Sequence, residues 1–256
     1  MTPPGGRHAQ RSLRVSVVIP VKDDAGPLRV CLAALAEQSR RPFEVIVVDN
    51  GSSDDSARVA VAFGASVVAE PAPGIAAAAS AGYDAALGEV IARLDADSVP
   101  SSDWIERIAA HFERDGTLGA VTGPGTFPEL RGVRRVLADV LYMNAYFALV
   151  GAALAHRPVF GSNFAMRGEV WRSVRCRVHR DDPEVHDDMD LSIVLGWDHV
   201  IRLDRALALP VSARPFHSLR SMWRRNRRAF HTLRVGGREA SSVRRWRRRL
   251  ERTLAR

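Results

Sequence analysis

The chain has 256 residues, of which 46% are hydrophobic and 26% are charged, so it can bury a sizeable core as one large domain. Its two cysteines, Cys31 and Cys176, stand alone without CxxC spacing, which argues against a disulfide framework or a cysteine zinc site and favours a reducing compartment. The net charge of +8 is concentrated in residues 214–256, where 15 Arg and two Glu give +13 and leave −5 for the rest.

The first residues, MTPPGGRHAQRS, contain Pro, Gly and charged side chains but no apolar segment, so they lack the central part of a secretory signal. We expect a flexible N-terminus over residues 1–12 and a cytoplasmic protein. The Arg-rich tail, residues 216–256, is expected to be helical and to attract an anionic partner. Such a tail can hold a protein peripherally at the inner face of the cell membrane.

Short apolar runs alternate with segments of helical spacing through the first hundred residues. Each short run is rich in β-branched residues and ends at a turn signal, which is typical of a buried strand. Strands that alternate with helices predict an α/β fold with a mostly parallel central sheet flanked by helices. The predicted strands span residues 15–19, 45–48, 65–69 and 90–94, and an alanine-rich helix spans 75–87.

A longer apolar stretch, residues 133–155, has helical periodicity with aliphatic side chains on one face. Its uncharged part, from Val140 to Ala155, contains 16 residues, which is short of the roughly 20 needed to span a bilayer. We therefore expect a helix in the protein core rather than one in contact with a membrane.

Acidic side chains collect where the predicted strands end. Asp23 follows the first strand, Asp49 ends the second, and Asp95 and Asp97 follow the fourth in the run RLDADS. Because parallel strands end at the same edge of a sheet, these carboxylates are expected to converge there. Two carboxylates one residue apart suit a hard divalent cation that also binds a diphosphate, although such pairs also occur in solvated turns.

Five blocks of sequence carry a more specific resemblance, and they cover about residues 13–215. In order they are VSVVIPVKDD, VIVVDNGSSDDS, GEVIARLDADSVPSSDWI, GSNFAMRGEVW and HDDMDLS. Together they resemble the family 2 inverting glycosyltransferases. The resemblance implies a single GT-A-type catalytic domain over 13–215, with a nucleotide-binding half (13–100) and an acceptor half (101–215). It implies hexosyl transfer from a nucleotide sugar with Mg²⁺ or Mn²⁺ as cofactor.

The donor-side roles implied by the resemblance fall on the strand ends. The backbone beside Pro20, together with Asp23 and Asp49, would face the nucleotide. Asp95 would contact ribose or metal, and Asp97 would hold the metal on the diphosphate. Such a cation stabilises the charge that builds up on the leaving group.

Two basic side chains complete the expected donor site. Family members often carry an Arg-Asn pair where this chain has Ala79 and Ser80, so Arg93 is expected to supply positive charge near the diphosphate. His217, which follows the last expected core strand, is a candidate further metal ligand; a structural histidine beside Phe216 is the alternative.

The acceptor-side roles fall on two later motifs. In HDDMDLS, Asp188 would be the general base that takes the proton from the acceptor hydroxyl, and Asp187 stands where the family usually has glutamate. Gly161, Ser162 and Asn163 would approach the acceptor closely. The tail lacks the QxxRW signature of processive synthases, so a single transfer is expected.

The sequence leaves the substrates and two alternative functions open. The donor could be UDP-, GDP- or TDP-linked, and the acceptor could be a sugar, a lipid-linked compound or a small molecule. One alternative is a sugar-phosphate nucleotidyltransferase, but the loop VKDDAGPLR has one glycine where such enzymes have a Gly-rich phosphate loop. The other is a membrane-binding or nucleic-acid-binding protein that uses the Arg-rich tail, and nucleic acid is the less favoured partner.

Overall fold

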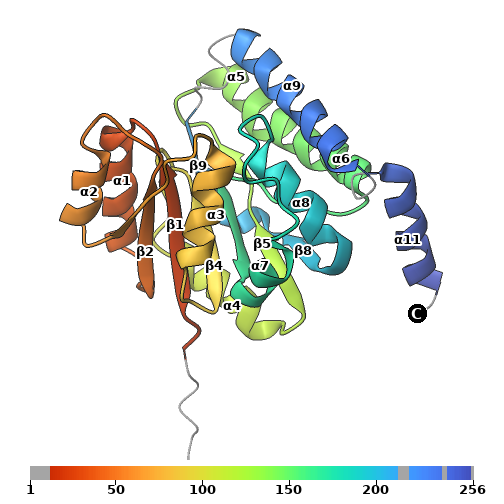
Figure 1. Ribbon diagram of the computed structural model, residues 1–256, viewed down its shortest axis with the longest axis horizontal. Helices are drawn as coiled ribbons and strands as arrows, with labels where there is room; N and C mark the ends of the chain where they lie inside the picture. Colours follow the sequence, from red (N-terminus) through yellow and green to blue (C-terminus); the bar gives the residue numbers. More distant parts are fainter. Residues whose placement is uncertain (1–11, 213–218, 238–240, 255–256) are drawn as a thin grey trace, which may run out of the picture.

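The computed structural model describes residues 12–212, 219–237 and 241–254. Within them, one seven-stranded sheet of order β3-β2-β1-β4-β7-β5-β8 lies between two layers of helices (Figure 1). This confirms the predicted α/β fold. The strands are β1 (Val15–Val21), β2 (Glu44–Asp49), β3 (Ser66–Ala69), β4 (Val90–Leu94), β5 (Leu118–Thr122), β6 (Gly125–Thr126), β7 (Asn163–Arg167), β8 (Val200–Leu203) and β9 (Leu209–Pro210).

The first four strands form the parallel half of the sheet. β1 pairs with β2 on one side and with β4 on the other, and β3 extends the sheet beyond β2. All four predicted strands are present, and β1 is buried along its whole length. Since the three adjacent strands β2, β1 and β4 run in the same direction, Asp49, Asp23 and Asp95 do lie at one edge of the sheet, as the sequence predicted.

The second half of the sheet begins with a reversal. β7 runs antiparallel to both β4 and β5, whereas β8 runs parallel to β5. The register pairs Leu94 of β4 with Asn163 of β7. This pairing brings the Gly161–Ser162 turn next to the residues that follow β4. A separate pair of short strands, β6 and β9, lies outside the main sheet.

Helices cover both faces of the sheet. One core cluster joins the sheet to α1, α2 and α4, and a second joins the opposite face to α3, α7 and α8. The helices are α1 (Ala25–Ala36), α2 (Ser56–Ala62), α3 (Ile75–Ala85), α4 (Trp104–Arg114), α5 (Gly132–Val136), α6 (Met143–Leu154), α7 (Gly168–Val174), α8 (Asp187–Asp198), α9 (Leu219–Val235) and α11 (Ser242–Leu254).

The apolar stretch after residue 132 forms one continuous helix, Gly132–Leu154, in which a π-helical turn, Leu137–Tyr142, joins α5 to α6. By length and composition it could cross a membrane. The expectation of a core helix is wrong, because most of its apolar side chains are exposed. Helical periodicity identified the helix, but periodicity alone does not show which side of an apolar helix the rest of the protein covers. The buried members are Ala138, Met143, Phe147 and Leu154.

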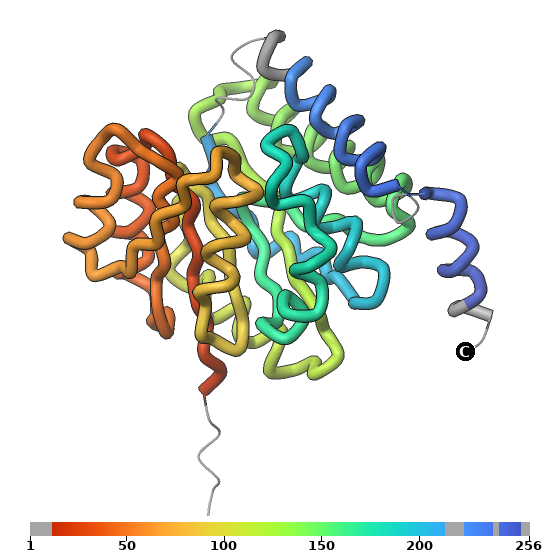
Figure 2. Tube along the Cα trace, in the orientation of Figure 1, coloured from red at the N-terminus to blue at the C-terminus, as the bar shows by residue number. Residues whose placement is uncertain are grey.

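The two tail helices pack on the acceptor half. Figure 2 shows the donor half, in red to yellow, on one side of the molecule and the blue C-terminal helices on the other. α9 contacts α8, and α11 contacts α6. Arg245 of α11 is buried and donates to the carbonyls of Leu154 (3.3 Å) and Ile193. The boundaries expected from the sequence at residues 13, 100 and 215 stay a prediction.

Packing of α3 on the sheet predicts different effects for two glycines. A Cβ added at Gly82 of α3 would lie 2.3 Å from Val18 Cγ1, whereas one at Gly26 of α1 would meet nothing within 4 Å. We expect Gly82→Ala to lower the free energy of unfolding by about 1–3 kcal/mol through overpacking. Gly26→Ala, the matched control in an exposed helical position, should raise it by up to about 1 kcal/mol. Urea denaturation measures both, and equal effects would contradict this packing.

Candidate active site

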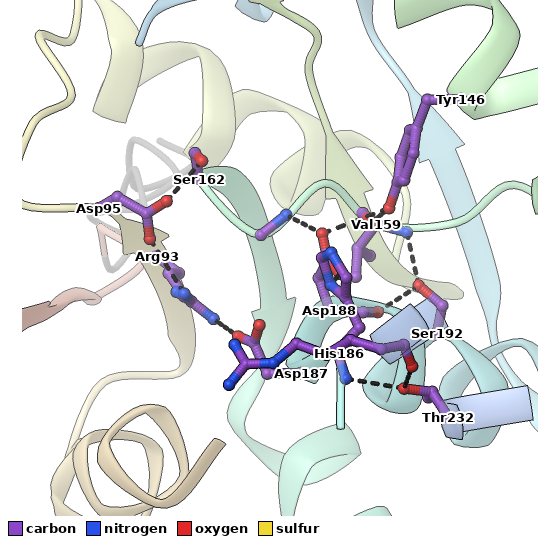
Figure 3. A network of polar contacts seen from close by, with 12 residues as sticks. Arg93, Asp95, Tyr146, Val159, Ser162, His186, Asp187, Asp188, Ser192 and Thr232 are labelled. Carbon is purple, nitrogen blue, oxygen red and sulfur yellow. Dashed lines mark hydrogen bonds and ion pairs between the residues drawn. The ribbon is translucent and has the colours of Figure 1, made fainter. Parts of the chain in front are cut away.

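The centre of the site is a buried arginine that joins the two halves of the protein. Arg93 of β4 donates to Asp95 Oδ1 (3.0 Å) and to Asp187 Oδ2 (Figure 3). A longer contact of 3.4 Å links its guanidinium to the hydroxyl of Tyr83 on α3. Arg93 therefore ties the acid after β4 to the acid that begins α8.

The charge on this arginine is maintained by its neighbours. Arg93 is almost fully buried. Burial lowers the pKa of Arg93, but Asp187, Tyr83 and Asp95 raise it well above its ordinary value. A buried cation held by two carboxylates is a fixed positive charge beside the expected diphosphate position. The sequence predicted positive charge from Arg93, and the structure adds that Asp187 and Asp95 already share it.

Three consecutive residues at the turn before β7 each contact a different part of the protein. The N–H of Gly161 donates to Asp188 Oδ2 (2.9 Å), and the hydroxyl of Ser162 donates to Asp95 Oδ2 (2.6 Å). The amide of Asn163 is buried, where it accepts from Trp104 Nε1 and donates to the carbonyl of Leu207. Gly161 and Ser162 thus contact the acids of this network, whereas Asn163 is buried behind them; their contact with an acceptor stays a prediction.

Asp188 lies in the interior end of the site. It forms a 2.6 Å ion pair with His186 Nδ1, in addition to its bond from Gly161. Burial alone would raise the pKa of Asp188, but His186 and the N–H of Gly161 hold it below its usual range. For His186 the effects are reversed: burial lowers its pKa, but the negative charge of Asp188 outweighs burial, so the pKa is raised. The two residues form a charged pair.

Two helices that are distant in sequence support this pair. The hydroxyl of Tyr146, on α6, lies 2.7 Å from the carbonyl of Val159 and 3.3 Å from Asp188 Oδ2. Burial and the charge of Asp188 raise the pKa of Tyr146, which keeps it a neutral donor. From α9, Thr232 Oγ1 accepts from the backbone N–H of His186 (2.7 Å). The acceptor side of the site therefore depends on both α6 and α9 (Figure 3).

The carboxylates after β4 are suited to a divalent cation. Burial raises the pKa of the Cys31 thiol to about 12, and the negative charges of Asp97 and Asp95 raise it further. Both carboxylates therefore lie near this one thiol. Both oxygens of Asp95 accept from protein donors, Arg93 and Ser162. Asp97 is the half-buried carboxylate beside it. Carboxylate oxygens are ligands that Mg²⁺ and Mn²⁺ prefer, so the chemistry of these residues fits a divalent cation.

Two histidines, His217 and His186, are further candidate metal ligands. His217 lies outside the described residues. His186, Asp187 and Asp188 offer ligand atoms within 4.8 Å of one another. Asp188 raises the pKa of His186, so a metal ion bound there would compete with the His186–Asp188 ion pair.

The remaining predicted donor residues shape the loops at the sheet edge. Asp23, at φ +53°, accepts from the N–H and the hydroxyl of Ser53, which links the loops after β1 and β2. Asp49 Oδ1 accepts from the N–H of Ser52 (2.9 Å), which closes the turn after β2. Pro20 is buried in β1. Asp23 and Asp49 thus hold the loops that border the expected nucleotide position.

Sequence reasoning did not single out three residues of this network. His186 stands immediately before the two acids of α8, and a histidine this close to Asp188 in sequence could have indicated their ion pair. Tyr146 is a polar-tipped side chain in an otherwise apolar helix. Thr232 lies 46 residues from His186, and no local pattern indicates that contact.

The comparison with family models decides the family. Residues 16–164 match the model described as glycosyl transferase family 2. The chain belongs to glycosyl transferase family 2. It is therefore a transferase enzyme. The family match does not support the two alternatives, a sugar-phosphate nucleotidyltransferase and a protein that only binds membrane or nucleic acid.

Individual relatives match over part of their length. An uncharacterized glycosyltransferase of Mycobacterium tuberculosis is 38% identical over 109 residues, which cover 43% of this chain and 47% of that protein. Glycosyltransferase AglE of Haloferax volcanii is 35% identical over 101 residues, 36% of this chain and 33% of AglE. This chain thus matches less than half the length of these relatives.

Solved structures share the fold over most of the chain. The mannosyltransferase PcManGT from Pyrobaculum calidifontis, in complex with GDP-Man and Mn²⁺, has a TM-score of 0.64 at 21% identity over 88% of this chain and 63% of its own. Glucosyl-3-phosphoglycerate synthase from Mycobacterium tuberculosis, in complex with Mn²⁺, UDP and glucosyl-3-phosphoglycerate, has a TM-score of 0.61 at 21% identity over 86% and 78%. These similarities confirm the GT-A fold.

The His186–Asp188 pair predicts a pH-dependent stability. The pKa of His186 is raised, so its contribution to the free energy of unfolding is complete below its ordinary pKa of 6.5 and is lost as pH rises through the folded value. The pKa of Asp188 is lowered, so its contribution is complete above 3.8 and is lost as pH falls through the folded value. We expect the stability difference between wild type and His186→Gln to be largest between these two values.

Urea denaturation at several pH values measures that difference. His111→Gln is the control, because it removes a different His–Asp pair, that of His111 with Asp204. A difference between wild type and His186→Gln that stays constant from acid to alkaline pH would show that the pair is not charged.

Proposed function

We propose that this protein is a metal-dependent inverting glycosyltransferase that moves one hexose from a nucleoside-diphosphate sugar to an acceptor hydroxyl. The observation that carries the proposal is the shared contact of Arg93 with Asp95 and Asp187, because it links the acid of the donor half to the acidic motif of the acceptor half. Family membership and the Mn²⁺ complexes of two neighbours with the same fold support it.

On the donor side, Asp97 is the proposed metal ligand, and Asp95 is its neighbour, fixed by Arg93 and Ser162. A bound Mg²⁺ or Mn²⁺ would neutralise charge on the diphosphate as the glycosidic bond breaks. Arg93 is paired with Asp95 and Asp187, so its role is to hold Asp95 in place beside the proposed metal position. Asp23 and Asp49 hold the two loops beside the proposed nucleotide position.

On the acceptor side, a carboxylate accepts the proton of the acceptor hydroxyl while its oxygen bonds to the anomeric carbon. The electron pair of the broken carbon–oxygen bond passes to the nucleoside diphosphate. Attack from the face opposite the leaving group inverts the anomeric centre. The acceptor side is bordered by Gly161, where an added Cβ would lie 3.1 Å from Asp188, so a larger residue would require Asp188 to shift.

Asp188 is the proposed base, and Asp187 is the alternative that its surroundings favour. A general base is most effective when its pKa lies near the working pH, and the pKa of Asp188 is depressed by His186. The Asp187 side chain is 13% exposed, whereas that of Asp188 is 6% exposed. The two acids are consecutive residues at the start of α8, so their side chains point in directions about 100° apart: Asp187 faces Arg93, and Asp188 faces His186.

Single substitutions distinguish the two acids. We expect Asp188→Asn to lower kcat by on the order of a hundredfold or more, because a lost general base typically costs that much. Asp187→Asn should act mainly by releasing Arg93 and should lower kcat less. The measurement is steady-state release of nucleoside diphosphate, with circular dichroism to confirm folding. The reverse order of effects would make Asp187 the base, and two near-wild-type variants would remove both acids from the mechanism.

Ligand-linked stabilisation tests the metal and the donor. A panel of UDP, GDP and TDP with Mn²⁺ or Mg²⁺ should raise Tm by about 5 °C or more for the matching nucleotide at about a hundredfold excess over Kd. We expect Asp97→Asn to abolish the metal-dependent part of that shift. Asp103→Asn is the matched control, because Asp103 is a nearby exposed acid that pairs with Arg107. An unchanged shift in Asp97→Asn would exclude Asp97 as the metal ligand.

A further inference from the structure

An exposed row of aliphatic side chains runs along the helix Gly132–Leu154, and we call it the apolar ridge. Its end members are 74% exposed at Val133 and 72% exposed at Leu149. Solvent-exposed aliphatic residues are common one at a time, but a contiguous row marks an interaction surface. The apolar ridge consists of Val133, Val136, Leu137, Val140, Leu141 and Leu149.

The opposite side of the same helix is fixed to the protein. Met143 and Phe147 are buried in the core, and Asp139 accepts from the N–H of Phe127 (2.7 Å). Tyr146 makes its hydrogen bonds with the interior of the site. Since one side of the helix is committed to the domain, the helix cannot cross a bilayer, and it has the geometry of a helix that lies at an interface.

The helix α9 exposes aromatic and basic side chains. α9 runs along the same edge of the molecule as α5 and α6 (Figure 1), and Leu233 of α9 and Val150 of α6 both pack against the buried pair Leu154 and Ile193. Trp223 and Phe230 of α9 are 67% and 74% exposed and lie seven residues apart on one helix face. Arg224 and Arg234 are exposed on the same helix. This combination of aliphatic, aromatic and cationic groups is typical of a surface that enters the headgroup region of a membrane.

We infer that the apolar ridge and the exposed face of α9 form one docking surface for an anionic phospholipid bilayer. Charge complementarity selects this partner, because α9 contains six arginines and no acidic residue. A second copy of the chain would bring two such arginine-rich surfaces together, which like-charge repulsion opposes. Nucleic acid would use the arginines and aromatics but would leave the aliphatic ridge in water.

The docking surface is directly connected to the candidate active site. Tyr146 reaches Asp188 from the side of the helix opposite the ridge, across a helix diameter of about 10 Å. Thr232 of α9 holds the N–H of His186. A bilayer on this surface would therefore lie close to the acceptor side of the site. In this respect the inference rests on the proposed function, since it places the acceptor at the membrane surface; the docking itself does not depend on catalysis.

Vesicle cosedimentation of the full chain tests the inference. The probes are vesicles of phosphatidylcholine alone and of phosphatidylcholine with phosphatidylglycerol. We expect binding to the anionic vesicles that weakens with added salt. Val133→Ser with Val140→Ser should weaken that binding about tenfold, because two aliphatic side chains no longer enter the bilayer. Arg224→Gln with Arg234→Gln should also weaken it, and it should reduce the salt dependence.

The control is Val30→Ser with Val61→Ser, two equally exposed valines on α1 and α2, at the other end of the molecule (Figure 1). It should bind vesicles as the wild type does, and thermal unfolding confirms that each variant is folded. Wild-type binding by the ridge variant, or no binding by the wild type, would overturn the inference. So would a ridge variant that breaks a dimer in light scattering, or a wild type that binds a single-stranded oligonucleotide instead of vesicles. Absence of sugar transfer with every donor would count against the proposed function only.

Discussion

Arg93 imposes the constraint on which the rest of the site depends. A guanidinium buried in the sheet is stable only if carboxylates meet it, and removal of one partner of a buried ion pair typically costs several kcal/mol. Asp95, directly after β4, and Asp187, at the start of α8, supply those carboxylates. The two segments lie 92 residues apart, so this one charge fixes how the end of β4 faces the beginning of α8. Ser162 adds a second tie to Asp95 from the turn before β7.

The contacts around Asp188 follow from the same arrangement. Once α8 begins at Asp187, its next residue points inward, and an unpaired carboxylate there would be strongly unfavourable. His186, the N–H of Gly161 and Tyr146 satisfy it from three different segments. This network keeps Asp188 charged and well positioned, but it also depresses the pKa that a general base needs. Positioning and basicity are therefore opposed at Asp188, which is why Asp187 is the relevant alternative.

The strands and the acidic sheet edge could be predicted because they depend on local sequence. Runs such as Val15–Val21 combine β-branched composition with a sharp end, and alternation with helices then implies parallel strands whose ends meet. The expectation for residues 133–155 was wrong because an apolar helix has the same pattern whether its neighbour is the core, lipid or another protein. The contact of Asn163 with Trp104 and that of His186 with Thr232 were out of reach for a different reason, since these partners are 59 and 46 residues away.

The contacts of α11 have a consequence for the order of folding. Arg245, Trp246 and Arg249 donate to the carbonyls of Leu154, Ala152 and Ala155, the last groups of α6, which have no partners within that helix. The donor half, from β1 to β4, is contiguous in sequence and can assemble early in synthesis. The carbonyls at the end of α6 gain these donors only after a segment about ninety residues further along the chain has been synthesised. The helix that carries Tyr146 to the site is therefore completed last, so the acceptor side matures after the donor side.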